Sequence, residues 1–286
     1  MEVNMKKKKH EGVYFFWSTS IIICMLVCVF VLGFTSCKKG TQTPDVSETP
    51  TETAEVSQSA EPSETDTPQS SETPGVIPSP TQGAEALLNE TEDMGQAYVD
   101  KFVFLGDSTT YGLGYYDIVP DSQVWTPASG TLTLSLWSTA TIVYPEDGSE
   151  IPIKDAALKK QPEYMLITLG VNGVSFMDEE YFITEYTNLV LAIKEASPNT
   201  KIILNSIYPV SASYPVSNGI TNEKIDAANV WIERIANSTG IKYLDSESVL
   251  KGSDGYLPES YNNGDGLHLN ADSFALVMKY LRTHGY

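Results

Sequence analysis

Phe102-Val103-Phe104-Leu105-Gly106-Asp107-Ser108 is the stretch that decides the fold. Its first four residues are apolar without alternation, and a glycine ends the run. A continuous apolar run predicts a strand that is covered on both faces, as in a parallel sheet. Open α/β sheets bind their ligands beyond the carboxyl ends of the strands. The stretch therefore predicts a buried strand and, directly after it, a functional site.

Three further apolar runs, at 165–169, 202–204 and 241–244, predict more strands of this kind. Apolar residues at helical spacing predict three helices, whose members are Phe182, Tyr186, Leu189, Val190 and Ile193, then Ile225, Ala228, Ile232 and Ile235, then Phe274, Val277 and Leu281. We expect Gly240 to end the second helix and Asn270 to cap the last. The order predicts a three-layer α/β/α sandwich with a mostly parallel sheet. Residues 107–160 are less regular, with short strands expected at 131–136 and 141–144.

Polar residues lie on three loops that this topology brings to one edge of the sheet. Ser108 follows the first strand, Asn172 follows the 165–169 strand, and Asp265 and His268 precede the last helix. Taken singly, each has a simpler explanation: Asp107 and Ser108 as a helix cap, Asn172 as a turn residue, and Asp265 with His268 as a surface turn. Their joint occurrence favours a catalytic site.

The chemistry of these groups is that of a serine nucleophile. A serine hydroxyl attacks well only when a base removes its proton, and histidine can do so near neutral pH. Of three histidines, His10 precedes the apolar N-terminal stretch and His284 lies two residues from the C-terminus. His268 is thus the predicted base, and Asp265 can hold its tautomer.

The sequence resembles the SGNH, or GDSL, hydrolase family over about residues 100–286. Gly106-Asp107-Ser108 matches the block that holds the nucleophile, Gly170-Val171-Asn172 the block with the oxyanion asparagine, and Asp265-Gly266-Leu267-His268 the Asp-x-x-His block. Gly130, after Val124-Trp125-Thr126, is the candidate for the family's glycine block.

The resemblance implies a flavodoxin-like SGNH fold and an acyl-enzyme on Ser108. The oxyanion donors would be the Ser108 backbone N–H, the Asn172 side chain and the Gly130 backbone N–H. No metal or organic cofactor is implied. Gly173 stands where relatives often have Asp, a position the chemistry does not require. The Gly-x-Ser-x-Gly elbow of α/β-hydrolases is absent from the sequence, which argues against that neighbouring fold.

The expected substrate is an O-acyl ester, chiefly O-acetyl, on carbohydrate or cell-wall polymer. Asp107, Tyr111 and Trp125 are the predicted substrate contacts. Tyr115, Trp137 and Tyr261 also lie near the site loops and either stack on sugars or fill the core. Three alternatives stay open: a lipase-like esterase or lysophospholipase, a catalytically silent polysaccharide-binding surface module, and acyl transfer to a sugar hydroxyl.

The N-terminal part is predicted to export and anchor the protein. Residues 1–40 contain a lysine block, Lys6 to Lys9, then an apolar stretch over 13–34 and Cys37. Thr35-Ser36-Cys37 resembles a bacterial lipoprotein signal with Cys37 as the lipidated residue, although Phe34 replaces the usual aliphatic residue. An uncleaved membrane helix is the alternative. Either anchor predicts a location on the outer face of the bacterial cytoplasmic membrane.

Charge and composition divide the rest of the chain. Residues 41–83 form a Thr/Ser/Pro/Glu-rich segment that we expect to be a disordered linker, and residues 84–286 form the hydrolase domain. The net charge is −19, so a nucleic-acid partner is not expected. The three cysteines, Cys24, Cys28 and Cys37, all lie in the first forty residues. The domain must therefore be stabilised by a hydrophobic core rather than by disulfides.

Overall fold

A computed structural model describes residues 85–286 of the chain. The predicted anchor with Cys37 and the predicted linker at 41–83 lie outside the described residues. Within 85–286, no helix has both the length and the apolar character needed to cross a membrane.

A five-stranded parallel sheet forms the centre of the domain, as predicted. Its strands are β1 (Phe102–Gly106), β2 (Val124–Trp125), β5 (Tyr164–Thr168), β6 (Lys201–Asn205) and β7 (Lys242–Leu244). They lie in the order β2-β1-β5-β6-β7 and all pair in parallel. This is the flavodoxin-like order, in which the chain reverses direction across the sheet beside the first strand. The carboxyl ends of β1 and β5 are thus the expected place for a site.

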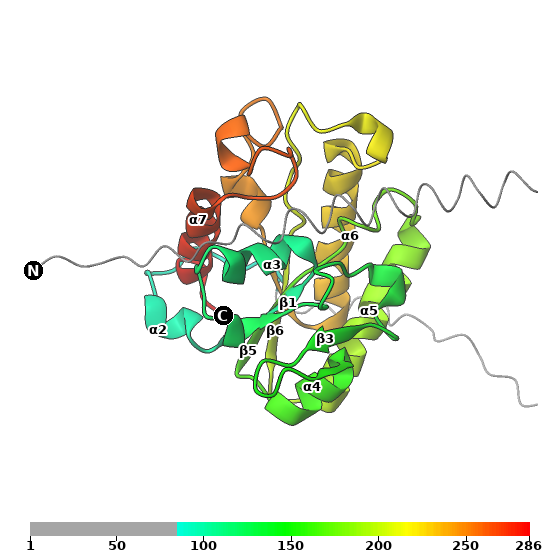
Figure 1. The fold of residues 1–286 in the computed structure, drawn as a ribbon, viewed down its shortest axis with the longest axis vertical. Helices are drawn as coiled ribbons and strands as arrows, with labels where there is room; N and C mark the ends of the chain where they lie inside the picture. The colour runs from blue at the N-terminus through cyan, green and yellow to red at the C-terminus, as the bar shows by residue number, and fades with distance from the viewer. Residues whose placement is uncertain (1–84) are drawn as a thin grey trace, which may run out of the picture. The chain divides into compact units, whose positions relative to one another are not determined.

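Helices cover both faces of the sheet (Figure 1). Successive strand residues belong alternately to the two cores between the sheet and these helices. Leu105, Ile167 and Leu204 belong to a core shared with α4 (Ile153–Lys160), α5 (Glu179–Ala196) and α6 (Asn222–Thr239). Phe104, Leu166 and Ile203 belong to a second core shared with α2 (Gln96–Val99), α3 (Ser108–Tyr115) and α7 (Ala271–Arg282). The predicted three-layer sandwich is confirmed.

The predicted helix ends agree with the structure. Gly240 ends α6 in the left-handed conformation, with φ of 67°. The Asn270 side chain caps α7 by accepting a hydrogen bond from the Ser273 backbone N–H. All the apolar residues that predicted α5, α6 and α7 are buried.

The segment between β2 and β5 differs in part from the prediction. Residues 131–136 are not a strand, because their end forms a short 3-10 helix, Leu134–Leu136, that packs against α5. Leu132 and Leu134 are nevertheless buried in the core. The alternation of apolar and polar residues in this segment therefore reflects alternate burial, although the segment does not pair as a strand. The predicted strand at 141–144 exists as β3 (Thr141–Val143), which pairs antiparallel with β4 (Glu150–Pro152).

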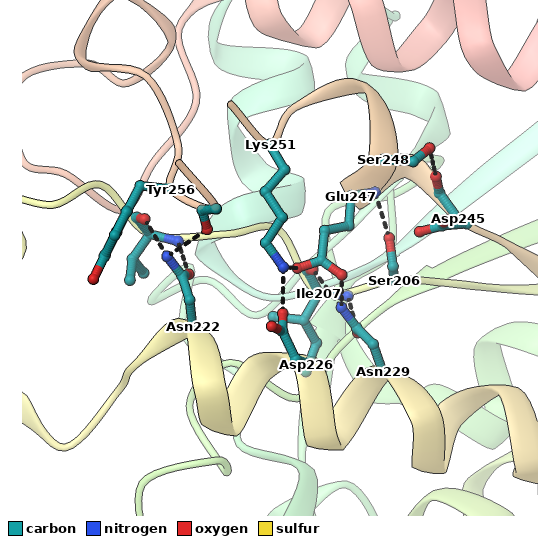
Figure 2. A network of polar contacts seen from close by, with 12 residues as sticks. Ser206, Ile207, Asn222, Asp226, Asn229, Asp245, Glu247, Ser248, Lys251 and Tyr256 are labelled. Carbon is teal, nitrogen blue, oxygen red and sulfur yellow. Dashed lines mark hydrogen bonds and ion pairs between the residues drawn. The ribbon is translucent and has the colours of Figure 1, made fainter. Parts of the chain in front are cut away.

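A buried polar network ties the loops at the carboxyl edge to α6 (Figure 2). The Asn229 side chain bonds both the N–H and the C=O of Ile207, at 2.7 and 3.1 Å, and donates to Glu247 at 2.8 Å. Asn222 bonds the N–H and C=O of Val210 in the same way. Two helix asparagines thus fix the loop that follows β6.

Candidate active site

Ser108 lies at the first position of α3, directly beyond the carboxyl end of β1. Asp107 caps this helix, since its Oδ1 accepts hydrogen bonds from the N–H of Thr109 at 2.9 Å and from the Thr109 hydroxyl at 2.7 Å. The first backbone N–H groups of a helix have no acceptor within it. The N–H of Ser108 is one of these, so a helix N-terminus faces any negative charge that forms beside the serine.

The structure brings Ser108, His268 and Asp265 into one hydrogen-bonded line. The His268 Nε2 atom is 2.8 Å from the Ser108 Oγ atom, and the His268 Nδ1 atom is 2.6 Å from Asp265 Oδ2. Ser108 begins α3, whereas Asp265 and His268 lie on the loop before α7, and Ser108 and His268 are 160 residues apart in sequence. The geometry is that of a nucleophile, a base and a carboxylate that orients the base.

Asp265 is held as a carboxylate. Partial burial raises its pKa, but hydrogen bonds from the His268 ring and from the backbone N–H groups of His268 and Leu267 outweigh this and lower the pKa to about 2. Both backbone bonds are 2.8 Å long. A permanently ionised Asp265 favours the tautomer of His268 that carries its proton on Nδ1, which leaves Nε2 free to accept the serine proton.

Asn262 organises the loop that carries this pair, a role that sequence reasoning missed. Its buried side chain accepts from the N–H of Gly264 at 2.7 Å and of Gly266 at 3.2 Å, and donates to Glu259 at 3.0 Å. Gly266 has φ of 79°, and a Cβ atom there would lie 2.7 Å from the Ser211 hydroxyl. The only sequence signal was an Asn-Asn-Gly turn beside the Asp-x-x-His block.

Asp107 is wholly buried, so the prediction that it contacts substrate is wrong. Burial raises its pKa to about 6, although the hydrogen bonds from Thr109 and the charge of His268 act in the opposite direction. Its Oδ2 atom accepts a hydrogen bond from the Asn172 amide at 3.2 Å. Asp107 therefore positions both the first turn of α3 and Asn172.

Two of the three predicted oxyanion donors already have acceptors in this structure. The Asn172 Nδ2 group donates to Asp107 and also to the Leu132 carbonyl oxygen, at 3.1 Å. The N–H of Gly130 donates to the Pro127 carbonyl oxygen at 2.8 Å, within its own turn. Catalytic hydrogen bonds are often completed only when substrate binds. Asn172 and Gly130 would have to exchange these acceptors for an oxyanion.

The predicted aromatic contacts separate into two groups. Trp125 is fully buried in the core, where its ring lies 6.2 Å from that of Tyr144, so its predicted role in substrate binding is wrong. Trp137 is partly buried and donates to Glu185. Tyr111 and Tyr115 are each about half exposed, at 51% and 52%. Burial of an aromatic ring follows from tertiary packing, which sequence proximity to the site does not reveal.

Within residues 85–286, no group of three or more His, Cys, Asp or Glu side chains is arranged to hold a metal ion. The arrangement supplies a serine that is hydrogen-bonded to a base able to accept and return a proton, and a helix N-terminus beside the serine where a negative charge can develop. These are the groups that acyl transfer from an ester requires.

Comparisons with known proteins give the following similarities. The profile of the family described as GDSL-like Lipase/Acylhydrolase matches residues 104–276. Among solved structures, a GDSL-like lipase from Bacteroides thetaiotaomicron is 20% identical with a TM-score of 0.46, covering 64% of this chain and 86% of that chain. A mutant of an acetyl-xylooligosaccharide esterase from Geobacillus is 16% identical with a TM-score of 0.42, covering 65% and 94%. No curated protein matches the chain.

Proposed function

The chain belongs to the GDSL-like lipase/acylhydrolase family and is a carboxylic ester hydrolase, and from this premise we propose that it removes O-acyl groups, chiefly O-acetyl, from carbohydrate or cell-wall polymer outside the cell. The observation that carries the hydrolase chemistry is the line from Ser108 through His268 to Asp265.

The proposed reaction follows from these contacts. As the Ser108 hydroxyl attacks the ester carbonyl, its proton moves to His268 Nε2, and Asp265 stabilises the resulting imidazolium. The oxyanion lies at the N-terminus of α3, against the N–H of Ser108, with Asn172 and Gly130 as further donors. His268 then protonates the departing sugar oxygen. Water, activated by the same histidine, hydrolyses the acyl-serine and returns the proton to Ser108.

A polymer substrate is favoured by the exposure of the catalytic residues. His268 and Asp265 keep 30% and 45% of their side-chain surface exposed. The gap lined by Asp107, Thr109 and Thr168 does not touch Ser108 and has no room for a molecule even as small as water, so it is not an acyl pocket. An open site suits a polymer that carries small esters.

We also propose that the N-terminal part tethers this domain to the outer face of the bacterial cytoplasmic membrane, with lipidation of Cys37 as the means. The support is the sequence pattern of residues 1–40 alone. Mass spectrometry of the protein from cell membranes, before and after Cys37→Ala, tests it. A diacylglycerol adduct that disappears in the variant supports lipidation, and an unmodified chain that keeps its first residues supports the uncleaved helix.

The central test compares p-nitrophenyl acetate with p-nitrophenyl octanoate. The full chain in detergent should cleave the acetate with the higher kcat/KM. Ser108→Ala should reduce kcat by at least about 10⁴-fold, because Ser108, His268 and Asp265 act together and the other two cannot work without the nucleophile. Acetate should also be released from O-acetylated glycans. An active Ser108→Ala variant would contradict the assignment of the nucleophile.

A lipase-like esterase is the second candidate, because apolar side chains are exposed on three loops of the carboxyl edge. Leu136, Phe176 and Val216 are 58%, 59% and 73% exposed. Side chains of this kind can receive a longer acyl chain or a lipid surface. A clear preference for octanoate over acetate would favour this function over the first.

A further inference from the structure

Helix α3 carries its two largest side chains, Tyr111 and Tyr115, on its outward side, unlike an ordinary surface helix. Its buried residues are Thr109, Thr110 and Leu113, whereas its two tyrosines are about half exposed. Surface helices normally bury their large apolar side chains against the core. On α3 only Leu113 does so, and the space beside it is closed: a Cβ atom at Gly112 would lie 2.5 Å from the Phe274 ring. The tyrosines are therefore not needed to fill the core.

These tyrosines lie in line with the nucleophile. Tyr111 and Tyr115 are three and seven residues after Ser108, so all three positions share one stripe of the helix surface. The two ring centroids are 6.3 Å apart, with an angle of 33° between the ring planes. Tyr115 also meets the ring of Tyr116 edge-on at 4.9 Å. Two neighbouring, braced rings thus extend from the reacting serine along the surface.

Helix α3, which carries Ser108 and both tyrosines, contains no Lys or Arg, and neither do the loop segments 116–140 and 252–270. Lys224, near the start of α6, reaches the loops after β5 and β6, where its Nζ atom donates to the carbonyl oxygens of Ser175 and Gly219 at 3.5 and 2.9 Å. Acidic residues do occur in the two loop segments, among them Asp117, Asp121 and Glu259. A ligand rich in carboxylate or phosphate would find no lysine or arginine on α3 itself and would be repelled by these acidic side chains.

We infer that Tyr111 and Tyr115 form a stacking platform that binds an uncharged glycan chain and presents its O-acyl groups to Ser108. This inference rests on the proposed function and narrows it to neutral acylated polysaccharide. Tyrosine suits the task because its ring is rigid, offers a large apolar face to the C–H face of a pyranose, and keeps a hydroxyl for hydrogen bonding. Stacking holds the chain without charge, in agreement with the absence of Lys and Arg from α3.

The alternative occupant, a long acyl chain, fits this platform less well. An acyl chain gains most from an enclosed apolar groove, whereas the two rings lie on a convex helix surface at half exposure. The exposed loop residues Leu136, Phe176 and Val216 are the place where a lipid would be expected instead. The two tyrosines therefore bear on the sugar part of the substrate, not on its acyl part.

The test uses the full chain in detergent and two chemically O-acetylated oligosaccharide series of matched length. One is neutral, a cello-oligosaccharide, and the other carries carboxylates, an oligogalacturonate. For each enzyme the readout is the ratio of kcat/KM on the oligosaccharide to that on p-nitrophenyl acetate. Tyr115→Ala and Tyr111→Ala should each lower this ratio on the neutral series about tenfold, mainly through KM, which corresponds to about 1.4 kcal/mol. Tyr115→Phe should restore most of it.

Tyr286→Ala is the matched control. Tyr286 is 44% exposed, but its ring packs against Tyr164 at the amino end of β5, on the edge of the sheet away from Ser108. The control ratio should equal that of the wild type. The wild type should also prefer the neutral series to the oligogalacturonate.

Three results would overturn the inference. If the wild type deacetylates the neutral glycan but the ratio is unchanged in both alanine variants, the platform is wrong and the proposed function stands. If the oligogalacturonate is used equally well, the restriction to neutral glycan is wrong. If p-nitrophenyl acetate is cleaved but neither glycan is, the proposed carbohydrate function fails, and the platform fails with it.

Discussion

Asn172 donates a hydrogen bond to the carboxylate of Asp107, with 3.2 Å between Nδ2 and Oδ2. This links the residue before the predicted nucleophile to Asn172, the predicted oxyanion donor after β5. Because Asp107 also caps α3, one buried carboxylate sets the positions of two parts of the site. The bond to Asp107 thereby fixes the amide of Asn172, and an oxyanion would have to replace the Leu132 carbonyl oxygen as the acceptor of its other N–H.

Asn172→Ala should lower kcat on p-nitrophenyl acetate by about 10²–10³-fold, since one oxyanion donor is worth that much. KM should change little, because the donor strengthens its bond only as the charge develops. Asn188→Ala, an exposed asparagine on α5, is the control and should keep wild-type kcat. Circular dichroism should verify that both variants are folded. A loss in Asn172→Ala smaller than tenfold would remove Asn172 from the oxyanion site.

The raised pKa of Asp107 makes stability depend on pH in a particular direction. Burial raises its pKa from the ordinary 3.8 of an aspartic acid to about 6 in the folded protein. The folded state therefore binds this proton more tightly, so its contribution to stability is complete below about pH 4 and is lost as the pH rises through 6. At about 1.36 kcal/mol per unit, the loss approaches about 3 kcal/mol.

Asp107→Asn removes that titration. We expect the difference in unfolding free energy, wild type minus variant, to shrink as the pH rises from 4 to 6.5 in urea denaturation experiments. Asp245 and Glu247, whose pKa values burial also raises, contribute equally to both proteins and cancel in the difference. A difference that grows over this range would mean that the folded protein prefers Asp107 ionised.

The sheet and the Ser108, Asp265 and His268 line could be predicted because each depends on information that is local in the chain. Uninterrupted apolar runs specify buried parallel strands, and the rule that sites lie at the carboxyl edge then brings distant loops together. The same argument cannot say which polar side chain on a loop is buried. Asp107 and Ser108 are neighbours, yet one is enclosed and the other reaches the surface, because α3 begins between them.

Aromatic residues show the same limit. Trp125 and Tyr111 both lie near the site in sequence, but Trp125 belongs to β2 and points into the core, while Tyr111 is on the outer side of α3. Helix α3 itself has glycines at 112 and 114 and no apolar periodicity, so its one indication in the sequence was the possible helix cap at Asp107 and Ser108. Its formation depends on the Asp107 cap and on close packing against α7, which only the folded structure shows.

Asn262→Ala tests whether the catalytic loop needs its internal hydrogen bonds. Loss of the acceptor for Gly264 and Gly266 should displace His268 and lower kcat/KM about 10- to 100-fold, because small misplacements are costly in catalysis. The double variant Asn262→Asp/Glu259→Gln keeps the acceptor oxygen for the two glycine N–H groups and lets the new glutamine donate to the new aspartate, in place of the original bond from Asn262 to Glu259. It should recover much of the activity, which a general loss of stability would not predict. Asn218→Ala, at an exposed position, is the control. Equal activities in the alanine variant and the double variant would show that Asn262 does not position the loop.

Asn229→Ala should destabilise the fold without altering the chemistry. The side chain is buried and makes three hydrogen bonds, to the N–H and C=O of Ile207 and to Glu247. Removing it leaves these groups unpaired, at a cost of about 2–5 kcal/mol in the free energy of unfolding. The folded fraction should keep its kcat on p-nitrophenyl acetate, because Asn229 touches neither Ser108 nor His268.

Asn229→Asp separates hydrogen bonding from packing at this position. The new carboxylate keeps the acceptor for the Ile207 N–H but faces Glu247 where the wild type offers an N–H donor. Two buried carboxylates repel each other, so urea denaturation at pH 7 should show this variant to be at least as unstable as Asn229→Ala, despite its nearly unchanged volume. Stability should return in part as the pH is lowered and one carboxylate takes up a proton. If Asn229→Asp is as stable as the wild type at pH 7, the side chain contributes by filling space and the network in Figure 2 does not hold the loop.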